Sequence, residues 1–273
     1  MEKVLLQENI LKNYPVQCIW QRHFSSSGNL AYHKEYEIHY IKRGTGYYFI
    51  ENRKYKFTHN NFVVIKSGEI HRFIPFNPPV HIEKGTLFFS PSFINREIKK
   101  IIETSPHIIR LGEREATLVE IIFRNISVEV ATKEMNWEEI VHYETMALIS
   151  LLKRCSSKKN PVPRHNPRVE SIMNYIEGHF TEDISLSDIA KKFFISESYL
   201  SHLFKNETGM PLKQYIFQRR IMEAKKLLTE HPEKKVYTVA GKVGFTDFTI
   251  FNRTFKKITG MTPSNYRRIS LRR

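Results

Sequence analysis

The segment Thr249-Ile-Phe-Asn-Arg-Thr-Phe-Lys256 decides how the C-terminal part of this chain folds, because an earlier segment, Ser198-Tyr-Leu-Ser-His-Leu-Phe-Lys205, repeats its pattern. Each segment continues into a Thr-Gly-Met turn, which begins at Thr208 in the first copy and at Thr259 in the second. A short helix, a tight turn and a second helix with a polar, basic face are typical of a helix-turn-helix unit that reads DNA. Two copies in one chain predict a monomeric unit that reads two stretches on one face of the DNA.

The two copies differ by one residue in their turns. Ala190 and Ala240, each in the first helix of its copy, lie 50 residues apart, whereas Leu200 and Phe251 in the second helices lie 51 residues apart. The second copy therefore has one extra residue between its two helices.

The second helix of each copy has an apolar face and, at spacings of three and four residues, a polar face opposite. We expect the polar faces to contact DNA through Ser198, Ser201, His202, Lys205, Thr249, Asn252, Arg253, Lys256 and Lys257. Asn252 and Arg253 suit adenine and guanine, and Ser201 and His202 occupy the matching positions in the first copy. The lysines suit phosphates. A solvated polar face is the alternative for any one residue, but the matched duplication favours DNA contact for the set.

Positive charge is concentrated in the same part of the chain. The 273 residues carry a formal net charge of +15, of which residues 158–273 contribute +11 and residues 1–157 only +4. A basic excess in one domain indicates a polyanionic partner, here double-stranded DNA, although a merely soluble basic surface would give the same excess. The length predicts two domains.

Neither the cysteines nor the apolar runs indicate an exported or membrane-bound protein. Cys18 and Cys155 are far apart and form neither a disulfide framework nor a metal-binding spacing. The first residues have no long apolar core behind a basic start, and no apolar run approaches the length of a membrane span. We therefore expect a cytoplasmic protein with no membrane partner.

Residues 16–90 predict an antiparallel barrel or jelly roll. Segments rich in β-branched and aromatic residues alternate with Gly, Asn and Pro turn signals. The expected strands are 16–24, 36–41, 47–50, 54–57, 62–65, 70–74 and 81–89. Many short, evenly spaced strands are typical of a small barrel, which encloses a pocket for a small molecule.

Helical spacing follows the strands, and helices are expected at 91–103, 113–130 and 137–155. The apolar stripe of the last one runs through Ile140, Tyr143 or Glu144, Ala147, Leu148 and Leu151 or Leu152. The stripe either packs on the barrel or pairs with a second copy of the chain, which would give a homodimer through residues 113–155.

The chain is therefore expected to be an α+β protein of three parts. Residues 1–155 form the barrel with two or three helices, residues 156–166 form a polar linker with two prolines, and residues 167–273 form an all-α domain of seven helices. The expected helix ends in this domain are N-caps at Asn166, Ser185, Ser196 and Thr262, a capping box of Ser185 with Asp188, a connector from Pro211 to about His231, and Gly178 as the end of the first helix.

The run from Val239 to Arg267 closely resembles the signature of the AraC/XylS family of bacterial transcription regulators, and the first copy resembles the weaker first half of that signature. Upstream, His33–Tyr40, Gly44–Gly46 and Lys66–Arg72 resemble the family's cupin-type sensor domain. This resemblance covers nearly the whole chain. It implies a sensor barrel that binds a small-molecule effector, a homodimer through the adjoining helices, and an activator that acts beside a promoter with RNA polymerase. The resemblance to this family favours a sugar as the effector.

Positions in the expected barrel predict His33, Glu37, Arg43 and His71 as effector-binding residues. A metal is also conceivable, because imidazoles and a carboxylate suit a divalent cation. A metal-binding cupin, however, has two histidines one residue apart, whereas His33 and His39 here are six residues apart with Glu37 between them. We therefore predict no metal, no cofactor, no catalytic residue and no enzymatic activity.

Two other functions compete with a sequence-specific regulator. A metal-dependent cupin enzyme fused to a DNA-binding module would carry a stoichiometric metal. An architectural DNA binder without an effector would protect DNA broadly, without a preferred site.

Overall fold

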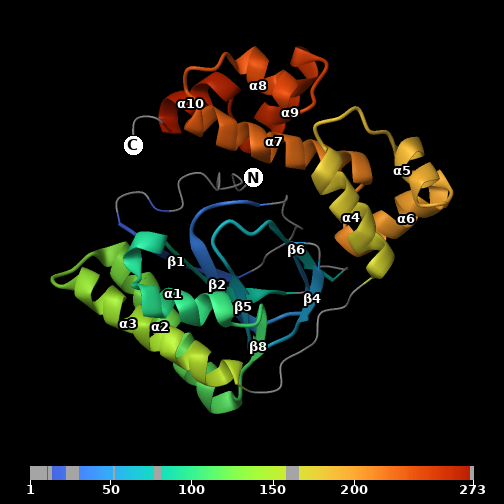
Figure 1. Cartoon of the computed structure of the whole chain (residues 1–273). Coiled ribbons are helices and arrows are strands. Elements are labelled where there is room, and N and C mark those ends of the chain that lie inside the picture. The colour runs from blue at the N-terminus through green and yellow to red at the C-terminus, as the bar shows by residue number, and fades with distance from the viewer. Residues whose placement is uncertain are drawn as a thin grey trace. The chain divides into compact units, whose positions relative to one another are not determined.

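The computed structural model describes residues 11, 14–22, 31–51, 53–76, 81–157 and 166–270 (Figure 1). The chain divides into two compact units, residues 1–164 and residues 165–273. The expected linker at 156–166 lies mainly outside the described residues. Within the described ranges, no helix combines the length and the apolar character that crossing a bilayer requires.

The first unit is built on two antiparallel sheets. The larger has the strand order β1 (Val16–Arg22), β7 (Glu83–Phe89), β2 (Tyr36–Arg43), β5 (Asn61–Ile65) and β8 (Ile108–Arg110), and the smaller has the order β4 (Arg53–Phe57), β3 (Gly46–Ile50) and β6 (His71–Pro75). All expected strands are confirmed, with described ends within two residues of those predicted. The sheets pack face to face through a shared apolar core, so the expected barrel has the form of a two-sheet sandwich.

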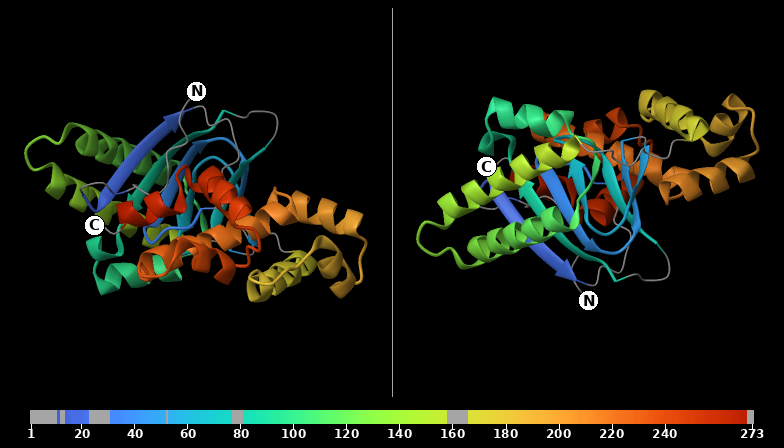
Figure 2. Two further views of the ribbon diagram at one scale, coloured as in Figure 1. Left: turned by 90° about the horizontal axis from the view of Figure 1, so that it is seen from above. Right: turned by 90° about the horizontal axis from the view of Figure 1, so that it is seen from below.

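Helices cover the outer face of the larger sheet. The helical segments are η2 (Pro91–Phe93), α1 (Arg96–Thr104), α2 (Glu113–Thr132) and α3 (Trp137–Ser156). The right-hand view of Figure 2 shows α2 and α3 lying across the strands. Gly85 on β7 permits this close packing, because a Cβ atom there would lie 2.4 Å from Cδ1 of Phe123 on α2.

Strand β2 is buried on both faces. Tyr36 and Tyr40 belong to the core shared with α2 and α3, whereas Ile41 belongs to the core between the two sheets. Because successive strand residues point to opposite faces, Glu37 and His39 share the inner face with Ile41. The alternation of this strand therefore places two polar residues inside the sandwich.

The buried face of α3 differs in part from the stripe that the sequence predicts. Leu148 is buried as expected, but Ile140 and Tyr143 are 38% and 70% exposed. The true stripe includes Val141 and Thr145, both fully buried. Both stripes have helical spacing. The buried one was not recognised in the sequence because its middle position is a polar threonine.

The second unit contains, among its described residues, the seven helices that the sequence predicts. They are α4 (Pro167–His179), α5 (Leu186–Lys192), α6 (Glu197–Thr208), α7 (Leu212–Glu230), α8 (Val236–Lys242), α9 (Phe248–Thr259) and α10 (Pro263–Ser270). Asn166 caps α4 by accepting a hydrogen bond from the Val169 amide, and Ser185 forms the expected capping box with Asp188. Local side-chain chemistry therefore starts these helices where the sequence indicated.

The prediction that Gly178 ends the first helix is wrong. Helix α4 continues through His179, and Phe180, at its C-cap, keeps a right-handed conformation. The guanidinium of Arg220 donates hydrogen bonds of 2.6 Å to the carbonyls of Phe180 and Glu182. A side chain from α7 thus satisfies carbonyl groups beyond the helix end, so no left-handed glycine is needed there.

The duplication is visible in the caps of α6 and α9, which have 12 residues each. Gly209 and Gly260 end them in left-handed conformations, with φ of +74° and +79°. The hydroxyls of Thr208 and Thr259 each donate to the carbonyl four residues earlier. Equivalent positions therefore end the second helix of both copies in the same way.

The turns within the two copies differ at one strained position. Gly244 has φ of +90°, and in the first copy Phe194, 50 residues earlier, has φ of +54° with a 95% exposed side chain. A Cβ atom on Gly244 would lie 2.6 Å from the Thr181 carbonyl oxygen. Glycine is thus required in the second copy, whereas the first copy tolerates a side chain at a conformational cost.

Gly244→Ala is expected to lower the free energy of unfolding of the second unit by at least about 1 kcal/mol, because of its positive φ and the clash with Thr181. Urea unfolding followed by helical circular dichroism measures the loss. Trp20 and Trp137 both lie in the first unit, so their fluorescence should keep its midpoint.

Phe194→Asn is the matched control. Asparagine tolerates the left-handed region, so this change is expected to raise the free energy of unfolding by roughly 0.5–1 kcal/mol. Equal stability of wild type and Gly244→Ala would contradict the tight turn.

Candidate DNA interface and effector site

The polar faces of α6 and α9 are exposed and correspond residue by residue. Leu200, Phe204, Phe251 and Phe255 are buried on the opposite faces and hold both helices in the core. Of the predicted DNA contacts, Ser198, Ser201, His202, Lys205, Thr249, Arg253, Lys256 and Lys257 are exposed, and Asn252 is half-buried. The geometry therefore presents all nine side chains at the surface of the second unit.

The start of each helix is capped next to its polar face. Ser196 accepts a hydrogen bond from the Tyr199 amide at the start of α6. Asp247 accepts hydrogen bonds from the amides of Thr249 and Ile250 at the start of α9, and these bonds hold the pKa of its carboxyl below the usual value. Asp247 therefore lies next to the polar face of α9, a position that was not predicted from the sequence.

Helix α7 joins the two copies and is tied to α4 by charged hydrogen bonds. Arg219 donates to both carboxylate oxygens of Glu177, at 2.7 and 2.6 Å, and Tyr215 donates to the same carboxylate at 3.2 Å. This two-point pairing fixes direction as well as distance. With 19 residues, α7 is roughly 28 Å long and holds α6 near one end and α9 near the other (Figure 1).

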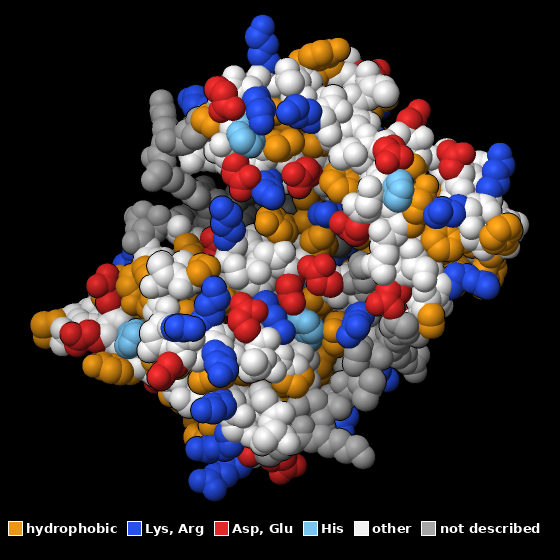
Figure 3. Space-filling view, in the orientation of Figure 1, with side chains coloured by type: hydrophobic (Ala, Val, Ile, Leu, Met, Phe, Trp, Pro, Cys, Tyr) orange, Lys and Arg blue, Asp and Glu red, His pale blue; other side chains and the backbone are white. Residues whose placement is uncertain are grey.

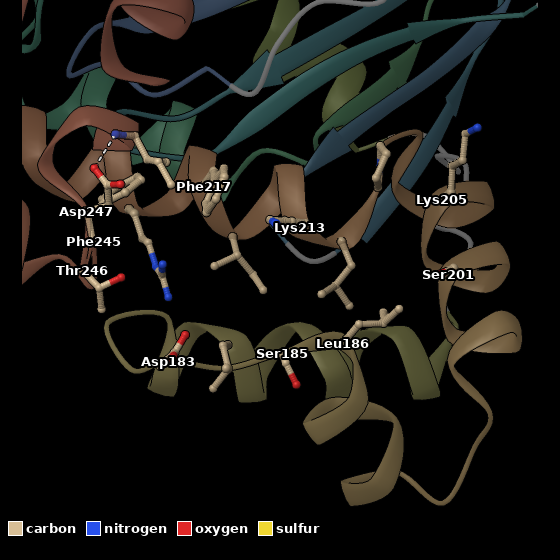
Figure 4. A pocket seen from close by; sticks show the side chains of 16 residues that line it. Asp183, Ser185, Leu186, Ser201, Lys205, Lys213, Phe217, Phe245, Thr246 and Asp247 are labelled. Atoms are coloured by element: carbon tan, nitrogen blue, oxygen red, sulfur yellow. Dashed lines mark hydrogen bonds between the residues drawn. The ribbon is translucent and has the colours of Figure 1, made fainter. Parts of the chain in front are cut away.

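A groove of about 690 Å³ runs beside α7 between the two copies. Figure 4 shows Ser201 and Lys205 on one side and Thr246 and Asp247 on the other. Lys213, Arg220 and Asp183 also line it. On the face seen in Figure 3, Lys and Arg side chains project over the second unit and are interspersed with Asp and Glu.

In the first unit, three of the four predicted effector residues meet inside the sandwich. Oε2 of Glu37 lies 3.2 Å from Nε2 of His33 and 3.0 Å from Nε2 of His71. Nε2 of His39 lies 2.8 Å from Oε1 of Glu37, without the alignment of a hydrogen bond. All four side chains are buried.

Burial and mutual charge set the protonation behaviour of this cluster. Burial alone would raise the pKa of Glu37, but the charge interaction with His39 and the hydrogen bonds of the His33 and His71 imidazoles hold it well below its usual value. Burial alone would lower the pKa of His33, but Glu37 raises it. Burial outweighs Glu37 at His39 and lowers the pKa of that imidazole to about 4. Glu37 is therefore a stable buried carboxylate.

A buried lysine that was not predicted from the sequence lies at the same site. Nζ of Lys84, on β7, lies 3.4 Å from the hydroxyl of Tyr48 and 3.5 Å from Nδ1 of His39. Burial lowers the pKa of Lys84 to about 8, although Glu37 opposes the shift. The available signal was the alternation of β7, which places Lys84 and Thr86 on one face, but only the strand register puts that face beside His39.

Arg43, the fourth predicted effector residue, lies outside this cluster. The register of β2 against β7 shifts between Ile41 and Arg43, which breaks the alternation that would have turned Arg43 inward. Arg43 is exposed and lines a separate hollow of about 470 Å³ with Tyr40 and Glu120.

Comparison with known proteins shows that the two units match two protein-family models. Residues 17–127 match the model of the AraC-like ligand binding domain, and residues 189–269 match a helix-turn-helix domain. The chain belongs to the AraC family of transcription regulators. Its ligand-binding domain contains the His33–Glu37–His71 cluster, and its helix-turn-helix domain carries the exposed faces of α6 and α9.

Two relatives that align with most of this chain are named as transcriptional regulators. The uncharacterized HTH-type transcriptional regulator YdiP of Escherichia coli is 25% identical over 251 residues, 89% of this chain and 81% of YdiP. The HTH-type transcriptional activator RhaR of Mannheimia succiniciproducens is 23% identical over 251 residues, 90% of each chain. A solved structure from Listeria innocua, of a protein of unknown function, is 38% identical over 38% of this chain and 98% of its own, with a TM-score of 0.37. The named relatives of this AraC-family chain are thus regulators.

Proposed function

We propose that this AraC-family regulator binds a defined operator with both copies, α6 and α9 entering successive major grooves on one face of the DNA. The observation that carries the proposal is the duplicated exposed stripe, in which Ser201 matches Asn252 and His202 matches Arg253. Helix α7 holds the two stripes in one unit. Its length of roughly 28 Å compares with about 34 Å between successive grooves on one DNA face.

The second copy supplies the stronger base-reading chemistry in this proposal. Arg253 can donate two hydrogen bonds to guanine, and Asn252 can bind adenine in the same way. In the first copy, Nδ1 of His202 is already within 3.1 Å of the Asn206 amide, which leaves its other nitrogen for a base. Lys205, together with the two lysines at the end of α9, would contact phosphates.

The first unit would bind a small polar effector. Support comes from its membership of the ligand-binding family and from the buried imidazoles, carboxylate and lysine inside the sandwich. Hydroxyl groups, as in a sugar, can both donate to Glu37 and accept from Lys84. Effector binding there would change how the chain engages its operator, so the protein acts by binding and without a catalysed reaction.

Activation of transcription, contact with RNA polymerase and a cytoplasmic location complete the proposal. Their support is the family resemblance, together with a relative that is named a transcriptional activator.

A homodimer through α2 and α3 also belongs to the proposal. Leu118, Ile121 and Val128 on α2 are 40%, 50% and 57% exposed, and they follow a spacing of three and seven residues along one face. Ile140 and Tyr143 add exposed apolar area on α3. A stripe of this kind on two adjacent helices suits pairing with the same stripe of a second copy.

Arg253→Ala is expected to weaken binding to an operator selected from random DNA by about 1–3 kcal/mol and to abolish the preference at one base pair. The measurement is a set of affinities for single base-pair variants of that operator. Lys256→Ala is the control, because the loss of a phosphate contact weakens binding to all variants alike. A uniform loss for Arg253→Ala would show that this side chain contacts only the backbone.

Ile121→Glu is expected to convert a dimer of the full chain into a monomer at micromolar concentration, because a carboxylate would be buried in an apolar interface. Light scattering coupled to size exclusion gives the molar mass. Ile269→Glu introduces the same change at an isoleucine of α10 that is 39% exposed, and it should leave the dimer intact. Identical masses for both variants would place the interface elsewhere.

A further inference from the structure

His33 and His71 are held in place by the backbone on both sides of Glu37. Ala31 and His71 exchange two backbone hydrogen bonds of 2.8 and 3.0 Å, and the Gly68 amide donates to the His33 carbonyl at 2.9 Å. The segment before β2 is thereby attached to β6. The two imidazoles and the carboxylate are positioned by main-chain pairing, before any ligand binds.

The hydrogen bonds of the two rings determine which nitrogen faces Glu37. Nδ1 of His33 lies 3.1 Å from the Glu35 carbonyl oxygen, and Nδ1 of His71 lies 3.0 Å from the Glu69 carbonyl oxygen. A carbonyl oxygen only accepts, so each Nδ1 carries a proton. A protonated ring then donates its Nε2 proton to Oε2 of Glu37, whereas in a neutral ring the Nε2 lone pair faces that oxygen and is available to a metal ion.

Three acceptor atoms thus converge where a cation is the natural partner. The same outer hydrogen bond, from the second ring nitrogen to a backbone carbonyl, orients histidines that bind metals. The three atoms lie within 4.8 Å of one another, and all three residues are buried. Bonds of about 2.0–2.2 Å to one ion place neighbouring ligand atoms roughly 3.0–3.6 Å apart, which agrees with the two separations of 3.2 and 3.0 Å.

We propose that Nε2 of His33, Oε2 of Glu37 and Nε2 of His71 bind a divalent transition-metal cation inside the ligand-binding domain. Two imidazoles and one carboxylate suit zinc, iron(II), cobalt(II) or manganese(II), whereas magnesium and calcium prefer oxygen ligands. Three protein ligands leave coordination positions open, which water or an oxygen atom of the effector can take. This proposal rests on the effector-binding part of the proposed function. DNA binding by α6 and α9 does not depend on the metal site.

The arrangement differs from the spacing on which the sequence prediction of no metal was based. That prediction required two histidines one residue apart on a single strand. Here His33 precedes β2, Glu37 lies on it, and His71 comes from the other sheet. The ligand set is therefore assembled by pairing between segments, which residue spacing does not reveal.

The test is a calorimetric titration of the full chain, without a histidine tag and stripped with a chelator, using Zn²⁺ and Co²⁺ as probes. We expect one tight site per chain, a visible spectrum of cobalt bound by nitrogen and oxygen, and a higher melting temperature with metal. His71→Gln and Glu37→Gln should each weaken binding on the order of 100-fold. His142→Gln, which removes an exposed histidine of α3, should bind as the wild type does.

Two results would overturn the proposal. One is a wild-type chain without a stoichiometric site. The other is wild-type affinity in folded His71→Gln and Glu37→Gln variants, which would mean that the metal binds elsewhere. Circular dichroism checks the fold of each variant, and the wild-type titration and cobalt spectrum decide the matter if a variant unfolds. Operator affinity of the metal-free chain separates this outcome from a failure of the DNA-reading proposal.

Discussion

The pairing of α7 with α4 is the interaction on which the DNA-reading unit depends. Arg219 binds Glu177 at two points, and the adjacent Arg220 donates to carbonyls beyond the end of α4. Because α7 also packs against the second copy through Ile221 and Leu228, one helix orients both helix-turn-helix copies. Without that connection, two helix-turn-helix units would bind DNA as independent, weaker modules.

Much of the fold could be predicted because its signals are local. Capping residues such as Ser185 and Asn166 act within three residues of their partners, and strand alternation needs only neighbouring positions. The misses depended on distant partners. Strand β8 has three residues and exists through its pairing with β5, and Gly178 does not end α4 because Arg220 satisfies the following carbonyls from 40 residues away.

The candidate sites divide in the same way. The polar faces of α6 and α9 could be predicted because helical spacing is a local signal that occurs twice in the chain. All nine predicted side chains lie at the surface. In the ligand-binding domain, His33, Glu37 and His71 do meet. Arg43 lies outside their cluster, because the register of β2 shifts before it. Lys84 was overlooked because strand order, and not sequence, brings β7 beside β2.

If α6 and α9, held in one unit by α7, bind successive major grooves on one face of the DNA, the spacing between their two DNA segments determines the affinity. The most direct measurement compares the affinity of the full chain for its selected operator with its affinity after insertion of about five base pairs between the two contacted segments. Half a turn of DNA moves one segment to the opposite face. We expect the affinity to fall on the order of 100-fold or more, because only one of the two helices can then bind. Unchanged affinity would show that α6 and α9 do not bind one face of the DNA together.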